Sequence, residues 1–167
     1  MSAMSNAMSN LNRMTFHGDR SVGGGDAGPL VLTPVIDNVT LVDRVKGFEQ
    51  GHGFTPAGGY GGLVPSYFQF GELRVYFMGK EERQWPRPEH LWLLACDCGE
   101  VGCWPLTARV VVLNDTVMWM DFAQDHRPGW DYSEFGPFVF ARDQYERAVE
   151  WAANEAEGEL DAHRARR

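Results

Sequence analysis

Two apolar, β-rich runs that flank a two-residue turn constrain the fold of this chain more than any other feature. Residues 106–113 (LTARVVVL) and 116–122 (TVMWMDF) are separated only by Asn114 and Asp115. Strand-forming runs joined by two turn residues are the pattern of a β-hairpin. The sequence therefore predicts antiparallel pairing in this part of the chain.

Other periodic segments place this hairpin in a larger sheet that is flanked by helices. The expected strands and helices are a strand in 29–38, a helix at 40–51 that Thr40 caps, strands at 72–79 and 91–98, a short extended piece at 138–140 and a long helix at 142–160. Each half-buried face of such elements needs a partner layer. We expect an α+β fold: a single two-layer domain in which an antiparallel β meander packs against N-terminal and C-terminal helices.

Composition suggests where this domain begins and ends. Residues 1–28 are rich in Gly, Ser and Asn and are expected to be a disordered segment or a tag, so that structure begins at Leu30. The domain should span 29–160, and 161–167 should form a basic tail. A chain that begins at Gly28 should then melt within a few degrees of the full chain.

Charge and hydropathy exclude several kinds of partner. The chain has 23 acidic and 15 basic residues, a net charge of -8, which disfavours nucleic acid. A signal peptide and an apolar run of about 18 residues are both missing, which argues against a membrane partner. We expect a cytoplasmic protein whose cysteines stay reduced.

All three cysteines of the chain lie in one short stretch, CDCGEVGC. Cys96 and Cys98 share one face of a strand, and Gly99 and Gly102 permit a tight turn that returns Cys103 to them. Three thiolates suit tetrahedral Zn²⁺, which needs a fourth ligand from elsewhere.

The favoured fourth ligand is His126, which lies just beyond the hairpin. His90, at the start of the cysteine strand, is the second candidate. Two other interpretations stay open, namely inert buried thiols and redox or nucleophilic thiols. Asp97 and Glu100 argue against the nucleophile, because neighbouring carboxylates disfavour a thiolate.

A charged, aromatic loop at 121–138 is the second candidate site. Loops between structured elements often carry binding residues, although these residue types are also ordinary in loops. The residues predicted to contact a ligand or partner are Asp125, Arg127, Trp130, Asp131 and Tyr132.

The motifs CDCGEVGC, WMDF and FGPFVFARDQYERAV resemble a group of small bacterial proteins. These share a Cys-Gly turn, a Trp-x-Asp-Phe strand end and a Phe-Gly-Pro-Phe entry to a final helix. The resemblance covers about residues 90–150 and implies no activity, so no catalytic residue follows from it.

The favoured function is a non-catalytic binding or regulatory domain, stabilised by a structural zinc, that binds a protein or a small molecule. One alternative is a zinc-dependent hydrolase with Asp125 or Glu134 as the base, which requires an open coordination position. A second alternative is an acidic inhibitor or immunity-type partner, with which the net charge is compatible.

Overall fold

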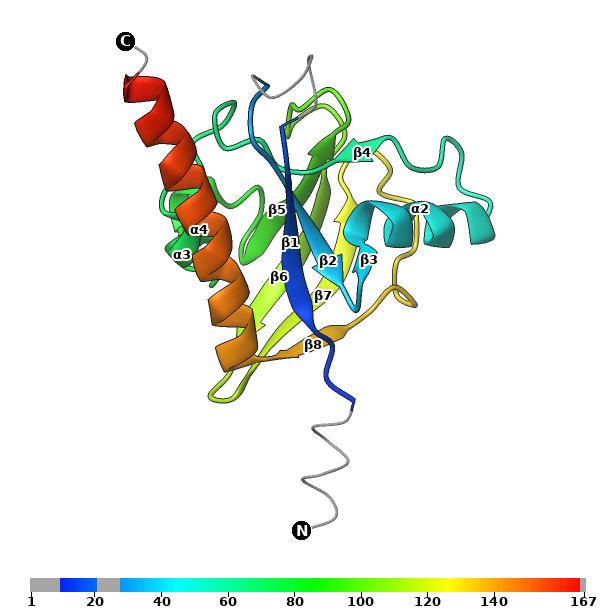
Figure 1. The fold of residues 1–167 in the computed structure, drawn as a ribbon. Helices are drawn as coiled ribbons and strands as arrows, with labels where there is room; N and C mark the ends of the chain where they lie inside the picture. Colours follow the sequence, from blue (N-terminus) through cyan, green and yellow to red (C-terminus); the bar gives the residue numbers. More distant parts are fainter. Residues whose placement is uncertain (1–9, 21–27, 166–167) are drawn as a thin grey trace.

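Two antiparallel sheets and three α-helices form the part of the chain, residues 10–20 and 28–165, that the computed structural model describes (Figure 1). The smaller sheet contains β1 (Met14–Asp19), β2 (Val31–Ile36) and β3 (Val39–Thr40). The larger sheet contains β4 (Tyr60–Gly61), β5 (His90–Cys96), β6 (Leu106–Val112), β7 (Thr116–Gln124) and β8 (Phe138–Ala141). The helices are α2 (Leu41–Gly51), α3 (Leu73–Tyr76) and α4 (Arg142–Ala165), with a 3₁₀ turn at Glu82–Gln84. The α+β class is confirmed.

The larger sheet is a meander in which the strands are neighbours in chain order. Its β6–β7 hairpin confirms the strongest sequence prediction. Val112 pairs with Val117, and the backbone N–H of Leu113 donates to the carbonyl of Thr116 at 2.8 Å. At the other end of the sheet, β4 pairs with β5 through Tyr60 and Cys96. The meander thus carries the cysteine strand between β4 and β6.

Strand β1 shows that the prediction of structure beginning only at Leu30 is wrong. Met14 pairs with Ile36 of β2, and Met14 and Phe16 are both buried. Their spacing of two is the burial period of a strand. The remainder of the expected N-terminal segment, residues 1–9 and 21–27, lies outside the described residues.

A chain that begins at Gly28 should therefore be far less stable than the full chain, because it lacks β1. A milder test is Met14→Ala, which removes a fully buried side chain and should lower the free energy of unfolding by about 2–5 kcal/mol. Urea denaturation measures this change, with the exposed neighbour His17→Ala as the control. Equal stability of wild type and Met14→Ala would show that β1 does not pack on the core.

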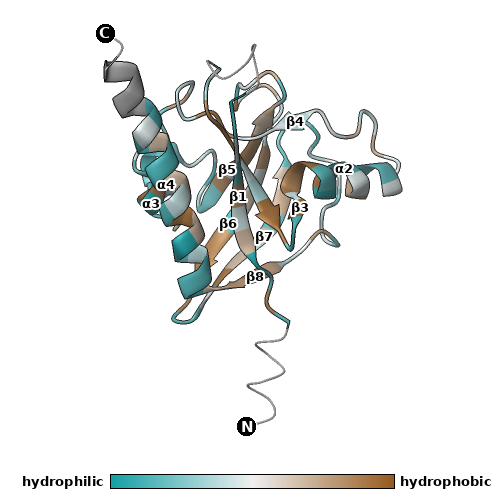
Figure 2. Ribbon diagram, viewed as in Figure 1, coloured by the Kyte–Doolittle hydropathy of each residue, from teal (hydrophilic) through white to brown (hydrophobic). Residues whose placement is uncertain are grey.

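Buried side chains from both sheets and from all three α-helices form one hydrophobic cluster in the described residues. In Figure 1, the smaller sheet crosses in front of the larger sheet, with α4 on the left of the view and α2 on the right. Helix α4 contacts β1, β7, β8 and α3. Figure 2 shows hydrophobic residues concentrated in the strands and hydrophilic residues along much of α4. The α4 helix therefore closes the core with one face.

The inward face of α4 carries apolar residues at helical spacing. Tyr145 and Val149 are buried, and Trp151 keeps 43% of its surface exposed. Glu150 instead forms an ion pair with Arg74 of α3 at 2.6 Å. The helix extends to Ala165, into the stretch that was expected to be a basic tail.

Val149→Ala should lower the free energy of unfolding by about 2 kcal/mol, because it deletes buried methyl groups. Glu150→Ala should barely change the melting temperature, since its ion pair is solvent-exposed. Thermal melts of the two variants make the comparison. Equal losses would mean that the opposite face of α4 packs inward.

The expected strand at 72–79 is wrong, since Leu73–Tyr76 form the short helix α3. Leu73, Tyr76 and Phe77 are buried at a spacing of three and four, the period of a helix. The strand was predicted because Leu73, Val75 and Phe77 alternate with Arg74 and Tyr76, which would place Tyr76 on the opposite face. Tyr76 is instead fully buried, and its hydroxyl donates to the carbonyl of Trp92 at 2.7 Å.

Candidate metal-binding site

The three cysteines lie at the end of β5 and in the tight turn that follows it. Cys96 ends the strand, and the backbone N–H of Gly99 donates to its carbonyl at 2.9 Å. The backbone N–H of Cys96 donates to the carbonyl of Glu100 at 3.1 Å, which closes the turn. Gly99 has a φ of 96°, a conformation that favours glycine. The predicted turn is therefore present, with Gly99 as the residue that permits it.

The turn brings the three sulfur atoms within 4.8 Å of one another. A tetrahedral zinc site with Zn–S bonds of 2.3 Å has sulfurs about 3.8 Å apart, so a small contraction suffices. Cys96 is buried, whereas Cys98 and Cys103 are exposed, and all three are free thiols. The cluster can hold a metal ion that reaches it from solvent.

Two of these sulfurs, those of Cys96 and Cys98, accept hydrogen bonds from backbone N–H groups of the turn. The N–H of Glu100 donates to Cys98 Sγ and lowers the pKa of that thiol, although the Glu100 carboxylate acts in the opposite direction. Burial raises the pKa of the Cys96 thiol to about 12, although the N–H of Cys98 donates to its sulfur. Adjacent thiolates repel one another, so full ionisation of the cluster needs a cation among them.

His126 lies beside the cysteine turn but is not part of the three-thiol group. Its Nε2 atom is 2.8 Å from the carbonyl oxygen of Gly102, the residue before Cys103. Its ring is nearly parallel to that of Trp104, with 6.3 Å between the centroids. To coordinate an ion in the cluster, the imidazole has to move, since neither of its nitrogens joins the three sulfurs within 4.8 Å.

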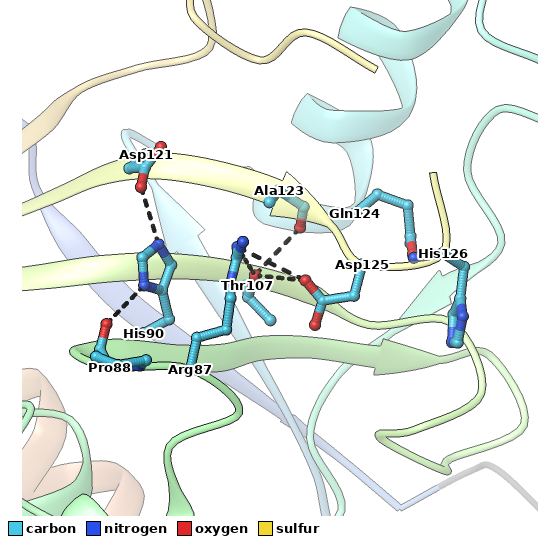
Figure 3. Close-up of polar contacts among 9 residues, drawn as sticks. All are labelled: Arg87, Pro88, His90, Thr107, Asp121, Ala123, Gln124, Asp125 and His126. Carbon is cyan, nitrogen blue, oxygen red and sulfur yellow. Dashed lines mark hydrogen bonds and ion pairs between the residues drawn. The ribbon is translucent and has the colours of Figure 1, made fainter. Parts of the chain in front are cut away.

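His90 is held elsewhere, at the start of β5 (Figure 3). Its Nδ1 atom is 3.0 Å from the carbonyl oxygen of Pro88, and its Nε2 atom is 3.0 Å from a carboxylate oxygen of Asp121. Both ring nitrogens are thus engaged away from the cluster. Of the two candidate histidines, His126 is the one that the structure places next to the cysteine turn.

The predicted ligand-binding residues lie in several different surroundings. Arg127 and Trp130 lie with Trp104: the guanidinium of Arg127 is 4.9 Å from the Trp104 ring centroid and 5.8 Å from that of Trp130. Asp125 instead lies 3.6 Å from the guanidinium of Arg87, in the loop before β5, and 3.5 Å from the hydroxyl of Thr107 on β6 (Figure 3). Asp131 accepts a hydrogen bond from the backbone N–H of Ser133, which lowers the pKa of its carboxyl group.

Tyr132, the last of these residues, is buried and belongs to a polar network that the sequence analysis missed. Its hydroxyl donates to Glu49, a fully buried carboxylate on α2, at 2.5 Å. The hydroxyl of Tyr60 donates to Glu49 at 2.6 Å, and the N–H of Gly58 donates at 2.8 Å. Gln124 in turn donates to the Tyr60 hydroxyl at 3.1 Å.

A signal for this network was present in the sequence. Leu41, Val45 and Glu49 are spaced by four, so the glutamate lies on the apolar face of its helix. A carboxylate at such a position requires buried donors. Three donors meet that requirement, and two of them, Gly58 and Tyr60, fix the glycine-rich segment 57–61 against α2.

Fold and cluster together define a small α+β protein with a three-thiol group at the end of a sheet strand. No helix in the described part of the chain combines the length and the hydrophobicity that crossing a membrane requires. Comparisons with protein-family models, curated proteins and solved structures found no match. The similarity to a group of small bacterial proteins stays a hypothesis.

Proposed function

We propose that the protein binds one Zn²⁺ through Cys96, Cys98 and Cys103, with His126 as the fourth ligand. The observation that carries the proposal is the approach of the three sulfurs to within 4.8 Å of one another. Thiolate and imidazole are the preferred ligands of zinc in closed, structural sites. The backbone N–H groups directed at the sulfurs support the same thiolate chemistry.

The ion has a structural role in this proposal. The cysteine turn contacts the segment around β4, because the N–H of Asp97 donates to the carbonyl of Gly59 at 2.9 Å. Trp104 Nε1 also donates to the carbonyl of Gly58 at 2.8 Å. An ion that fixes the turn thereby fixes the backbone that completes the Glu49 network. Binding free energy at such a site adds to folding free energy.

The domain itself is proposed to be non-catalytic and cytoplasmic, with a protein or small-molecule partner. Arg127 supports the partner surface, because its guanidinium is held over the Trp104 ring, an arrangement that stacked arginines use in recognition. For the hydrolase alternative, Asp125 pairs with Arg87, and Glu134 lies 3.3 Å from His52. Neither carboxylate belongs to the three-thiol group.

Titration with Co²⁺, a spectroscopic substitute for Zn²⁺, tests the ligand set. Wild type should develop sulfur-to-cobalt charge-transfer bands at one equivalent, and Zn²⁺ should displace the cobalt. Cys98→Ser should weaken these bands. His126→Ala should reduce affinity by about tenfold or more, the loss that follows even from removing a supporting partner. His17→Ala, an exposed histidine on β1, is the matched control.

Absence of a charge-transfer band in the wild type would overturn the proposal. If bands appear and His126→Ala binds as tightly as wild type, the thiolate site stands and His126 is the wrong fourth ligand. His90 or a water molecule would then be the fourth ligand.

A further inference from the structure

The potential metal ligands that converge at the cysteine turn are three sulfur atoms. Among the described residues, no imidazole or carboxylate joins Cys96, Cys98 and Cys103 within the 4.8 Å that the sulfurs span. Zn²⁺ needs a fourth ligand in such a site, whereas soft thiolates also select Cu(I), which is stable with three sulfurs. The geometry therefore suits a three-coordinate, thiophilic ion after a small contraction of the sulfurs and without movement of a fourth ligand.

Several contacts hold His126 away from the ion position. Besides the bond of its ring to the Gly102 carbonyl, its backbone N–H donates to the side chain of Gln124 at 2.9 Å. Gln124 is itself buried and fixed by Tyr60. The ring also lies parallel to Trp104. A fourth bond from His126 requires its ring to move relative to Gly102 and Trp104, and a three-coordinate ion leaves the ring in place.

The exposure of two thiols and a nearby carboxylate favour the binding of a cation that arrives from solvent. Cys98 and Cys103 are exposed, so a donor ligand in solution can approach two of the three sulfurs. Asp97 lies against the third, with one carboxylate oxygen 3.4 Å from Cys96 Sγ. A thiolate of the cluster can therefore replace a ligand of an ion that arrives from solvent.

We infer that the same three thiols bind one Cu(I) ion in a three-coordinate site that does not use His126. The inference rests on the proposed metal-binding function and extends it to a second ion. Cu(I) enters without a change in oxidation state, and thiol protons leave to solvent as the copper–sulfur bonds form. Zn²⁺ and Cu(I) then compete for one site but differ in their dependence on the histidine.

Competition of the full chain with a chromophoric Cu(I) chelator, in the absence of oxygen, tests this inference. Wild type should withdraw one equivalent of Cu(I) from the chelator. His126→Ala should keep its Cu(I) affinity within about threefold of wild type, while its Zn²⁺ affinity falls about tenfold or more. Cys98→Ser should lose Cu(I) affinity, and X-ray absorption at the copper edge should show sulfur ligands only.

The outcomes separate the two proposals. Failure to bind either ion would overturn the metal-binding function itself. Binding of Zn²⁺ without Cu(I) would overturn only the inference, and so would an equal loss of both affinities in His126→Ala. Retained Cu(I) binding with weakened Zn²⁺ binding in that variant supports it.

Discussion

Replacing Glu49 by alanine should lower the free energy of unfolding by about 3–5 kcal/mol, because three buried donors lose their acceptor at about 1–3 kcal/mol each. The carboxylate is fully buried and accepts hydrogen bonds from Tyr60, Tyr132 and Gly58. Without it, those donors lie in the interior with no acceptor, and each loses its compensation for leaving water. Urea denaturation of Glu49→Ala measures the loss.

Two further variants show whether the loss of stability comes from the Glu49 network or from helix α2 itself. Gln50→Ala alters an exposed side chain on the same helix and should leave stability nearly unchanged. Tyr132→Phe removes a single donor and should cost about 1–3 kcal/mol. A loss below about 1 kcal/mol for Glu49→Ala, well short of a broken buried pair, would show that the network does not hold α2 to the sheet.

Stripping the metal should lower the melting temperature of the wild-type protein by about 10 °C. A ligand present at a thousand times its dissociation constant stabilises the folded state by about 4 kcal/mol. In a chain of this size, each kcal/mol shifts the melting temperature by about 2–4 °C. Differential scanning calorimetry with and without a chelator measures the shift.

Lowering the pH should remove the stabilisation that the metal provides, because each thiol has to lose its proton before it binds the ion. Bound metal depresses the thiol pKa values in the folded state, so its contribution is present at high pH and is lost as pH falls. Cys96, whose thiol pKa is raised to about 12 in the metal-free protein, has the most to gain from the ion. A Cys98→Ser, Cys103→Ser variant is the control, since the chelator should not shift its melting temperature.

Local patterns predicted the elements that depend on neighbours in the chain. The turn at Asn114 and Asp115 specified the β6–β7 hairpin, since its strands pair across two residues. Thr40 capped α2 as expected, with its hydroxyl accepting from the N–H of Asp43. The convergence of the cysteines could likewise be predicted, because all three lie within one strand end and its turn.

Elements that depend on distant partners could not be predicted in this way. The strand β1 is short and precedes a glycine-rich stretch, and only its pairing with β2 shows that it is a strand. Residues 73–77 fit both a period of two and a helical spacing until the burial of Tyr76 decides between them. Glu49 finds its donors 9, 11 and 83 residues away, beyond any local pattern. The position of His126 beside the cysteine turn depends in the same way on contacts with Trp104 and Gly102.

The most direct test of the metal-binding account is the zinc content of the full chain, purified without chelator and measured by elemental mass spectrometry against protein concentration. The account predicts one zinc per chain for the wild type and almost none for the Cys98→Ser, Cys103→Ser variant, because a closed site with three thiolates retains its ion. A wild-type protein that is folded, fully reduced and free of metal, and that takes up no zinc when it is supplied, would contradict the account.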